Sequence, residues 1–408
     1  MGCNDCMYQL TEDLFYKYDS PAAYVSTGKS LTEKELDDFT AQHFLRIATL
    51  EHKPTKFSVV MNSNLEIGTS NDAENETAVL RLNQGPIDDD DIPQGFLVRP
   101  QKFFRLTGNK GRTWTVPVPA VQASVSQNAK SLVDVSPVRL MSRKKTDGLF
   151  LLPRSIAKEL DLSSCSRDIE YTGVRSGLIS ATQLIIQRAS LELDINPEEF
   201  EVLEPRIFKD KPILQLADVL ANGAGFCRRL SETMSGDDKP LVLKLIESMV
   251  LQPENDLLMR RFVEPFHLEK CQTACYYCMQ RYGNRMYHGL LDWRLGIAFL
   301  RVLIDPNYLV GLNGEQRDFE NKNWLDHVRV YVKNLGAMRP DVLSYQEVSL
   351  GQLTLPALKR KNSLNIVVHP FWNKKYITAL LKESCPQAEI RLFNSFEAAR
   401  RPINILSA

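Results

Sequence analysis

The feature that most constrains this chain is a cluster of three cysteines, Cys271, Cys275 and Cys278, with the spacing C-x3-C-x2-C. They are three of only eight cysteines in the 408-residue sequence. A short loop can turn several thiolates towards one point, and thiolates are ligands that Zn²⁺ prefers in tetrahedral sites. The alternative is three free, partly buried thiols, since cysteine also behaves as a small apolar residue. We expect a loop built around structural Zn²⁺.

A closed tetrahedral site needs a fourth donor, which this spacing does not supply. Two residues are equally good candidates for the fourth ligand. Cys227 follows a glycine-rich turn, and His288 can reach the cysteines if the chain folds back on itself. His267 and Glu269 are closer in sequence but are ranked lower, because their side chains can point away from the loop. An open position with bound water, which implies catalysis, is a further alternative.

The stretch from residue 271 to residue 293 resembles the MrfA-like zinc-binding domain, a family of modules associated with superfamily-two DNA helicases. The residues that carry the resemblance are Cys271, Cys275, Cys278, Tyr282, Asn284, His288 and Leu291-Asp292. Residues 217–226 are similar to the strand and glycine-rich turn of the same family, so the resemblance covers residues 175–305. The repair-helicase form has a further cysteine where this chain has Glu269.

The DrmB-like form of the family, from the DISARM antiphage system, is the more similar one, because the sequence contains no helicase motor. The resemblance implies a non-motor zinc-binding subunit that partners a DNA helicase or translocase in bacterial antiphage defence. It further implies that the surfaces around Arg228, Arg229, Arg281 and Arg285 meet DNA or the motor. No catalytic residue is assigned, and the chain is expected to be an accessory subunit rather than an enzyme.

Composition limits the classes of protein that the chain can belong to. Lysine and arginine number 50 and are balanced by 50 acidic residues, so overall positive charge cannot attract nucleic acid and any contact must come from local patches. No apolar run approaches the roughly 18 residues that span a bilayer, so no membrane partner is expected. The N-terminus lacks the features of a signal peptide, and clustered cysteines without one indicate reduced thiols in the cytoplasm.

We expect a mixed α/β fold in three parts. Residues 1–147 form a β-rich, α+β region, residues 148–305 form the zinc-binding domain, and residues 306–408 form a C-terminal α/β unit packed on it. In the first part Cys3 and Cys6 are either a partial zinc knuckle or spare thiols at a frayed end. A helix is expected to run to about Thr49.

Hydrophobic periodicity predicts most elements of the other two parts. The expected strands are 147–152, 200–203, 213–216, 364–368 and 388–393, and the expected helices are 177–195, 239–250, 295–304 and 374–383. His369 follows a strand, where α/β folds place their chemistry. Phe371 occupies the lysine position of the H-x-K motif of phospholipase-D-like nucleases, so His369 is interpreted as structural.

Two other functions compete with the helicase-associated one. The first is a nuclease that uses His369, His288 or an acidic loop, although the sequence has no H-x-K motif and no paired carboxylates. The second is a stand-alone zinc-containing protein that binds nucleic acid without a helicase partner.

Overall fold

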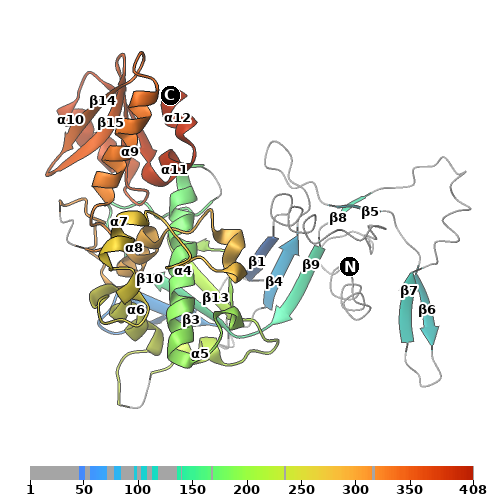
Figure 1. Cartoon of the computed structure of the whole chain (residues 1–408). Helices are drawn as coiled ribbons and strands as arrows, with labels where there is room; N and C mark the ends of the chain where they lie inside the picture. The colour runs from blue at the N-terminus through green and yellow to red at the C-terminus, as the bar shows by residue number, and fades with distance from the viewer. Residues whose placement is uncertain are drawn as a thin grey trace, which may run out of the picture. The chain divides into compact units, whose positions relative to one another are not determined.

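A computed structural model describes residues 46–50, 56–70, 78–83, 96–98, 103–107, 113–117, 136–138, 140–166, 169–233, 236–314 and 318–407. The chain divides into two compact units, one from residues 1–52 and 77–145 and the other from residues 53–76 and 146–408 (Figure 1). Cys3 and Cys6 lie outside the described residues. The boundaries expected after residues 147 and 305 remain a prediction.

Every described element of the first unit is a strand, in keeping with the β-rich region expected there. Its largest sheet is antiparallel and has the order β1-β4-β9, formed by β1 (Arg46–Leu50), β4 (Ala78–Asn83) and β9 (Leu140–Lys145). Two further pairs are β5 (Phe96–Val98) with β8 (Ser136–Val138), and β6 (Phe103–Thr107) with β7 (Thr113–Pro117). The prediction of a helix to about Thr49 is wrong for its last residues, because residues 46–50 form the strand β1. Pairing with β4 overrides the local helical pattern there.

The second unit is organised on an antiparallel sheet of order β11-β13-β10-β3-β2, with β12 also paired to β13. Its strands are β2 (Ser58–Val59), β3 (Leu65–Thr69), β10 (Gly148–Pro153), β11 (Phe200–Val202), β12 (Arg206–Phe208) and β13 (Lys211–Asp218). Every residue of β10 is buried, as expected of a central strand covered on both faces. The strands predicted at 147–152, 200–203 and 213–216 are therefore present.

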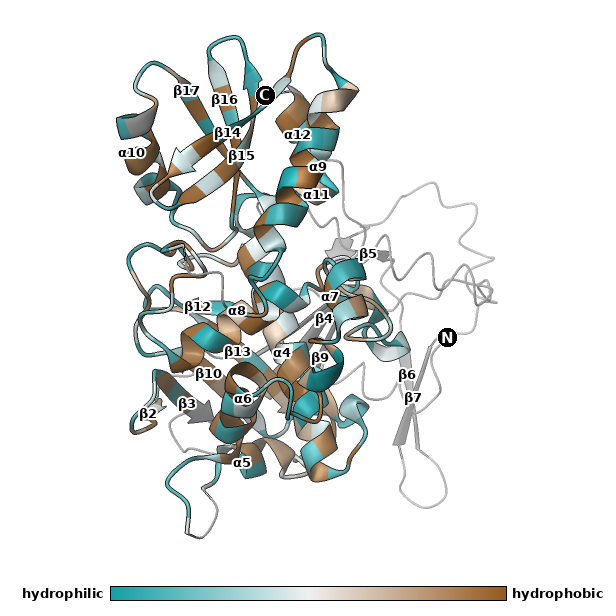
Figure 2. Cartoon of the chain, turned by 60° about the vertical axis from the view of Figure 1, so that its left-hand side comes forward, coloured by the Kyte–Doolittle hydropathy of each residue, from teal (hydrophilic) through white to brown (hydrophobic). Residues whose placement is uncertain are grey.

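Two long buried helices cross this sheet, α4 (Thr172–Leu193) and α8 (Trp293–Ile304) (Figure 1). They approach closely because Gly296 has no side chain: a Cβ there would lie 3.0 Å from Ser180 Cβ. Figure 2 shows hydrophobic residues running through β10, β13, α6 (Leu241–Leu251) and α8, where the main core lies. Shorter helical elements are α5 (Phe226–Ser231), α7 (Pro265–Lys270), η2 (Ile169–Tyr171), η3 (Pro197–Glu199), η4 (Met259–Arg261) and η5 (Tyr282–Tyr287).

A second sheet, of order β14-β15-β16-β17, closes the C-terminal part of the same unit. It contains β14 (Ser344–Leu350), β15 (Leu353–Arg360), β16 (Ser363–Val368) and β17 (Glu389–Asn394), with α9 (Trp324–Met338), α10 (Lys374–Ser384), α11 (Ser395–Arg400) and α12 (Pro402–Ser407). The predicted β16, α10 and β17 are confirmed, and β16 and β17 pair in parallel across the α10 crossover. None of the described helices is long and apolar enough to cross a bilayer.

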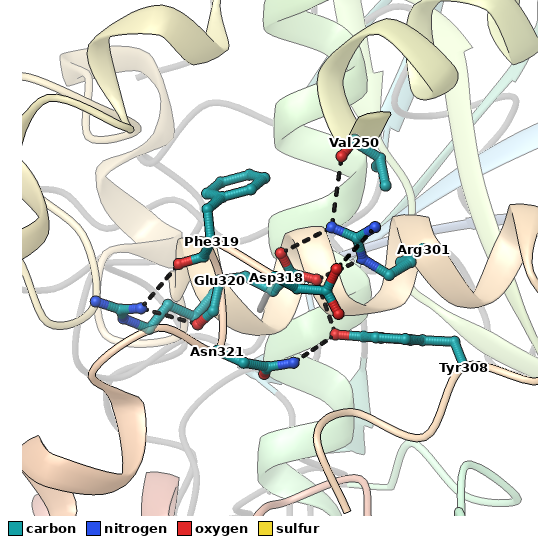
Figure 3. A network of polar contacts seen from close by, with 8 residues as sticks. Val250, Arg301, Tyr308, Asp318, Phe319, Glu320 and Asn321 are labelled. Carbon is teal, nitrogen blue, oxygen red and sulfur yellow. Dashed lines mark hydrogen bonds and ion pairs between the residues drawn. The ribbon is translucent and has the colours of Figure 1, made fainter. Parts of the chain in front are cut away.

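A buried polar network fastens the segment after α8 to that helix (Figure 3). Arg301 Nε donates to Glu320 at 2.6 Å, and the Glu320 carboxylate also accepts from Tyr308 Oη at 2.8 Å. Asp318 lies 3.2 Å from Arg301 Nη1, and Asn321 donates to Tyr308 Oη at 2.9 Å. The Glu320 side chain has no exposed surface, so its charge depends on these partners.

Replacement of Glu320 by alanine should therefore cost about 3–5 kcal/mol of unfolding free energy, because it leaves the buried Arg301 charge poorly compensated. The matched control is Asp326→Ala, which removes the largely exposed partner of Arg329 on α9 and should cost about 0–1 kcal/mol. Urea denaturation of the purified variants measures both values. Equal losses for the two variants would contradict the role assigned to the network.

Candidate metal centre

Four side chains converge at the start of the cysteine loop: His267, Cys271, Cys275 and Cys278. Their ligand atoms all lie within 4.8 Å of one another. Cys278 Sγ is 3.8 Å from Cys271 Sγ and 3.6 Å from Cys275 Sγ. Tetrahedral Zn²⁺ with Zn–S bonds of about 2.3 Å separates its sulfur ligands by about 3.8 Å, so these separations fit one zinc ion.

The two ring nitrogens of His267 have the surroundings that are expected of a metal ligand. Nδ1 lies 3.0 Å from the carbonyl oxygen of Phe262, whereas Nε2 is buried without a hydrogen-bond partner among the described residues. A metal-bound imidazole usually donates its other N–H to a carbonyl or carboxylate, which fixes the tautomer and the ring orientation. An unpartnered buried nitrogen also costs free energy unless something binds it. His267 therefore completes a Cys₃His donor set.

Local helical geometry brings the first two donors together. α7 begins with Pro265, a residue well suited to the first turn of a helix, and places His267 four residues before Cys271. Residues four apart lie on the same face of a helix, and the Cys271 N–H donates to the His267 carbonyl at 2.8 Å. A tight turn then supplies the other two thiols, since the Cys275 N–H lies 3.2 Å from Cys278 Sγ.

The first turn of α8 holds this loop against the core. Trp293 is fully buried and donates through Nε1 to the Cys271 carbonyl at 3.1 Å, and its backbone N–H donates to Thr273. The His267 and Phe262 rings pack on Trp293 at centroid distances of 5.7 and 6.0 Å. The buried Asp292 side chain caps α8 by accepting from the N–H groups of its first turn.

Electrostatics favour a thiolate in this cluster. The hydrogen bond between the two thiols lowers the pKa of Cys278 and raises the pKa of Cys271. A thiolate is the form of cysteine that binds metal. All four donors come from the protein and three of them are buried, so the site is closed, as in structural rather than catalytic zinc centres.

The structure does not bring Cys227 or His288 to the three cysteines. Cys227 lies in α5, where its N–H donates to Asp218 and its Sγ lies 3.8 Å from the Leu216 carbonyl. The imidazole of His288 is turned towards the loop that follows the cysteines, with Nε2 at 3.0 Å from the Arg281 carbonyl and 3.1 Å from Asn284 Oδ1. Among the described residues, the donor beside the cysteines is His267 instead.

The glycine-rich turn before α5 is occupied by a side chain of the protein itself. The Asp218 carboxylate accepts from the N–H groups of Ala224 at 2.8 Å, Phe226 at 3.1 Å and Cys227 at 3.0 Å. These are the amides that would otherwise bind a phosphate at a helix N-terminus. The turn therefore connects β13 to α5 by internal hydrogen bonds.

The four arginines expected at a DNA or partner surface lie in two parts of the chain, one in α5 and the other in and just before η5. Arg228 and Arg229 are exposed on α5, at 3.8 and 3.5 Å from the Glu232 carboxylate. Arg285 is exposed on η5 and lies over the Tyr282 ring at 5.0 Å. Arg281, just before η5, is half-buried, and this burial lowers its pKa.

His369 has a structural environment. It is buried, and burial lowers its pKa to about 3, so the imidazole is neutral at physiological pH. Its Nδ1 accepts from the Phe371 N–H at 3.1 Å, and its ring packs on Trp324 at 5.1 Å. A side chain in this position holds the end of β16 and is poorly suited to hydrolysis of a phosphodiester.

Sequence reasoning ranked His267 too low as a ligand. The signal for it is the spacing His-x3-Cys directly after Pro265, which indicates a short helix whose last turn faces the metal. Sequence distance alone does not show that the helical conformation of α7 turns the imidazole towards the cysteines.

No family model and no curated protein matches the chain. Among solved structures it is similar to the crystal structure of the DUF1998 helicase MrfA bound to DNA, with a TM-score of 0.30 and 10% sequence identity. The similarity covers 64% of this chain and 25% of that chain, so this chain spans about a quarter of that protein. A similarity of this extent does not by itself establish a shared fold or activity.

We predict that this cluster binds one zinc ion, which is lost on substitution of any of the four donors, for example His267→Ala or Cys271→Ser. The matched controls are Cys227→Ser and His288→Ala, which remove the same residue types outside the cluster and should leave the zinc content unchanged. Elemental analysis of purified protein by mass spectrometry measures the metal. If His267→Ala retains zinc and one of the control variants loses it, the residue changed in that control is the fourth ligand.

Asp292 leads to a prediction about pH. Burial raises the pKa of this carboxyl from 3.8 to about 6, so the folded protein binds its proton more tightly than the unfolded chain. The contribution of Asp292 to stability should therefore fall as pH rises from about 4 to about 6 and stay constant above that range. Asp292→Asn keeps a capping oxygen and cannot ionise.

The unfolding free energy of the Asp292→Asn variant, relative to wild type, should increase across this window. Denaturant titrations of both proteins at a series of pH values measure the difference between their unfolding free energies. An effect of metal release that is the same in both proteins does not contribute to this difference. A difference that does not change with pH would show that burial does not raise the pKa of the Asp292 carboxyl.

Proposed function

We propose that the chain is a non-motor, zinc-stabilised subunit of a DNA helicase or translocase complex, of the DrmB-like kind, that acts in antiphage defence in the bacterial cytoplasm. The observation that carries the proposal is the closed Cys₃His cluster formed by residues 267, 271, 275 and 278. The sequence signature over residues 271–293 supports the family, and the geometry of the cluster supports the role of metal within it.

The zinc ion has a structural role in this proposal. Folding around the ion orders the loop, because structural zinc contributes its binding free energy to the folded state. The loop in turn carries η5, which bears Arg285 and Tyr282 on the protein surface. Zinc therefore stabilises a surface that can contact DNA or the motor.

Three groups that could have taken part in catalysis or phosphate binding favour an accessory role: the Cys₃His cluster, His369 and the backbone amides before α5. The donor set of the cluster leaves no position for a metal-bound water. His369, one of the candidate residues of the nuclease alternative, is buried and neutral, which argues against its use in catalysis. The amides of the α5 turn are occupied by Asp218, so they do not offer a phosphate site.

We predict that the tagged full-length chain, expressed in its native host, copurifies with a large superfamily-two ATPase. His267→Ala should reduce the recovered ATPase by roughly tenfold or more, because loss of zinc unfolds the loop. Met338→Ala, which removes an exposed side chain on α9 away from the cluster and from η5, is the control and should leave the recovered ATPase unchanged. Quantitative mass spectrometry of the purified complexes measures both.

Two results would contradict the proposal. Metal-dependent cleavage of DNA by the purified chain would establish a nuclease. Wild-type chain that carries zinc, binds nucleic acid and copurifies with no ATPase would establish the stand-alone alternative.

A further inference from the structure

We propose that the segment of residues 271–293, here called the zinc loop, binds single-stranded nucleic acid by stacking unpaired bases on the exposed rings of Tyr276 and Tyr282. This inference rests on the proposed function and deepens it, because it names the substrate class and the residues that contact it. It is carried by the exposure, the fixed positions and the charged surroundings of these two rings.

Five large apolar or aromatic side chains between residues 266 and 286, the stretch that contains the four candidate ligands, are exposed to solvent. The exposed fractions are 77% for Tyr282, 74% for Tyr276, 53% for Met286, 48% for Phe266 and 43% for Tyr277. Single exposed hydrophobic residues are ordinary, but a group of them on one short segment usually marks a binding site. We refer to these five residues as the aromatic face.

The two most exposed rings are held in place by the loop. Tyr276 lies between the ligands Cys275 and Cys278, and its ring meets the His288 imidazole in a T-shaped contact at 5.6 Å. His288 is itself fixed by hydrogen-bonding contacts to Arg281 and Asn284. A ring that is already ordered loses little conformational entropy on binding, which favours affinity.

Tyr282 carries a cation on one side of its ring. The Arg285 guanidinium lies 5.0 Å from the ring centroid, and Nη1 is 3.3 Å from the Tyr282 hydroxyl. An arginine beside an aromatic ring can stack on a base or neutralise the adjoining phosphate. Tyr277 differs from the other two tyrosines, because its hydroxyl is hydrogen-bonded to the Glu264 carboxylate at 2.9 Å and its ring packs on Phe266.

Charged side chains lie on the same segment of the chain as the aromatic face. Arg285 lies over the Tyr282 ring, and exposed cations also occur at Arg260 and Lys270, with carboxylates at Glu264 and Glu269. Aromatic rings interleaved with cations are typical of surfaces that bind single strands.

The strand must be unpaired to use this surface. In a duplex each base is stacked on its neighbours, so its faces are not available to a protein ring, whereas single-stranded bases can be splayed out. Stacking tolerates any base, because every base has an aromatic face. The aromatic face should therefore show little sequence preference.

The test compares the zinc-loaded full-length chain on three fluorescent ligands of equal length by anisotropy: oligothymidine, an abasic strand and a duplex. Wild type should bind oligothymidine at least tenfold more tightly than the abasic strand, which has the same phosphates and no bases to stack. Tyr276→Ala and Tyr282→Ala should each weaken oligothymidine binding roughly tenfold. Tyr276→Phe and Tyr282→Phe, which keep the ring, should bind like wild type.

Two controls separate stacking from loss of structure. Each variant should retain one zinc ion, and Met338→Ala, which removes an exposed side chain on α9, should bind like wild type. Equal affinity of wild type for oligothymidine and the abasic strand would overturn the inference. So would unchanged binding by both alanine variants, or loss of ATPase copurification in these variants without any change in strand binding.

These outcomes are distinct from failure of the proposed function. A protein that carries zinc and copurifies with the ATPase, but binds oligothymidine and the abasic strand equally, overturns only the stacking inference. A protein that lacks zinc or copurifies with no ATPase, yet loses strand binding in the alanine variants, retains the stacking inference and overturns the helicase-associated role.

Discussion

The convergence of four donor atoms within 4.8 Å is the constraint on which the rest of the zinc loop depends. The outer part of this loop offers few buried apolar side chains: Tyr276, Tyr277 and Tyr282 face the solvent. A segment of this composition cannot be ordered by a hydrophobic core of its own, because the entropy cost of fixing its backbone is not offset by burial. His267 and the cysteines could hold a metal ion, and the binding free energy of such an ion would add to the stability of the folded loop.

The loop is joined to the protein through the beginning of α8. Trp293 connects it to the core by its indole N–H and by aromatic packing, and Asp292 caps the helix directly before it. The same helix binds the Glu320 carboxylate through Arg301, and its Arg294 donates to the Glu320 carbonyl at 2.8 Å. The helix α8 therefore fixes both the zinc loop and the segment around Glu320, which leads to the C-terminal sheet.

Several groups that resemble reactive sites in sequence have structural roles here. The glycine-rich turn is closed by Asp218, and His369 is buried against Trp324. In both cases a polar group is hydrogen-bonded within the protein, which is the usual state of buried polar side chains. Tyr276 and Tyr282 differ from these groups, because their rings are largely exposed to solvent.

The sequence by itself determined the three cysteines of the candidate metal centre and several helices and strands of the second unit, among them β10, β13, α4 and α8. This was possible because thiol spacing and hydrophobic period are local properties. The pair β14 and β15 and the helix α9 were not predicted; β14 and β15 pair with each other along their length, and α9 packs on both. Strand pairing and burial override local preference in such elements.

Only the tertiary structure decided which residue stands fourth in the cluster and which tyrosines are exposed. His267, Cys227 and His288 have equally suitable ligand chemistry, and sequence distance does not say where each side chain points. The short helix from Pro265 and the packing of Trp293 turn His267 inward, while Asp218 and Asn284 hold the other two elsewhere. The physical reason is that side-chain direction depends on backbone conformation and on neighbours that are distant in the chain.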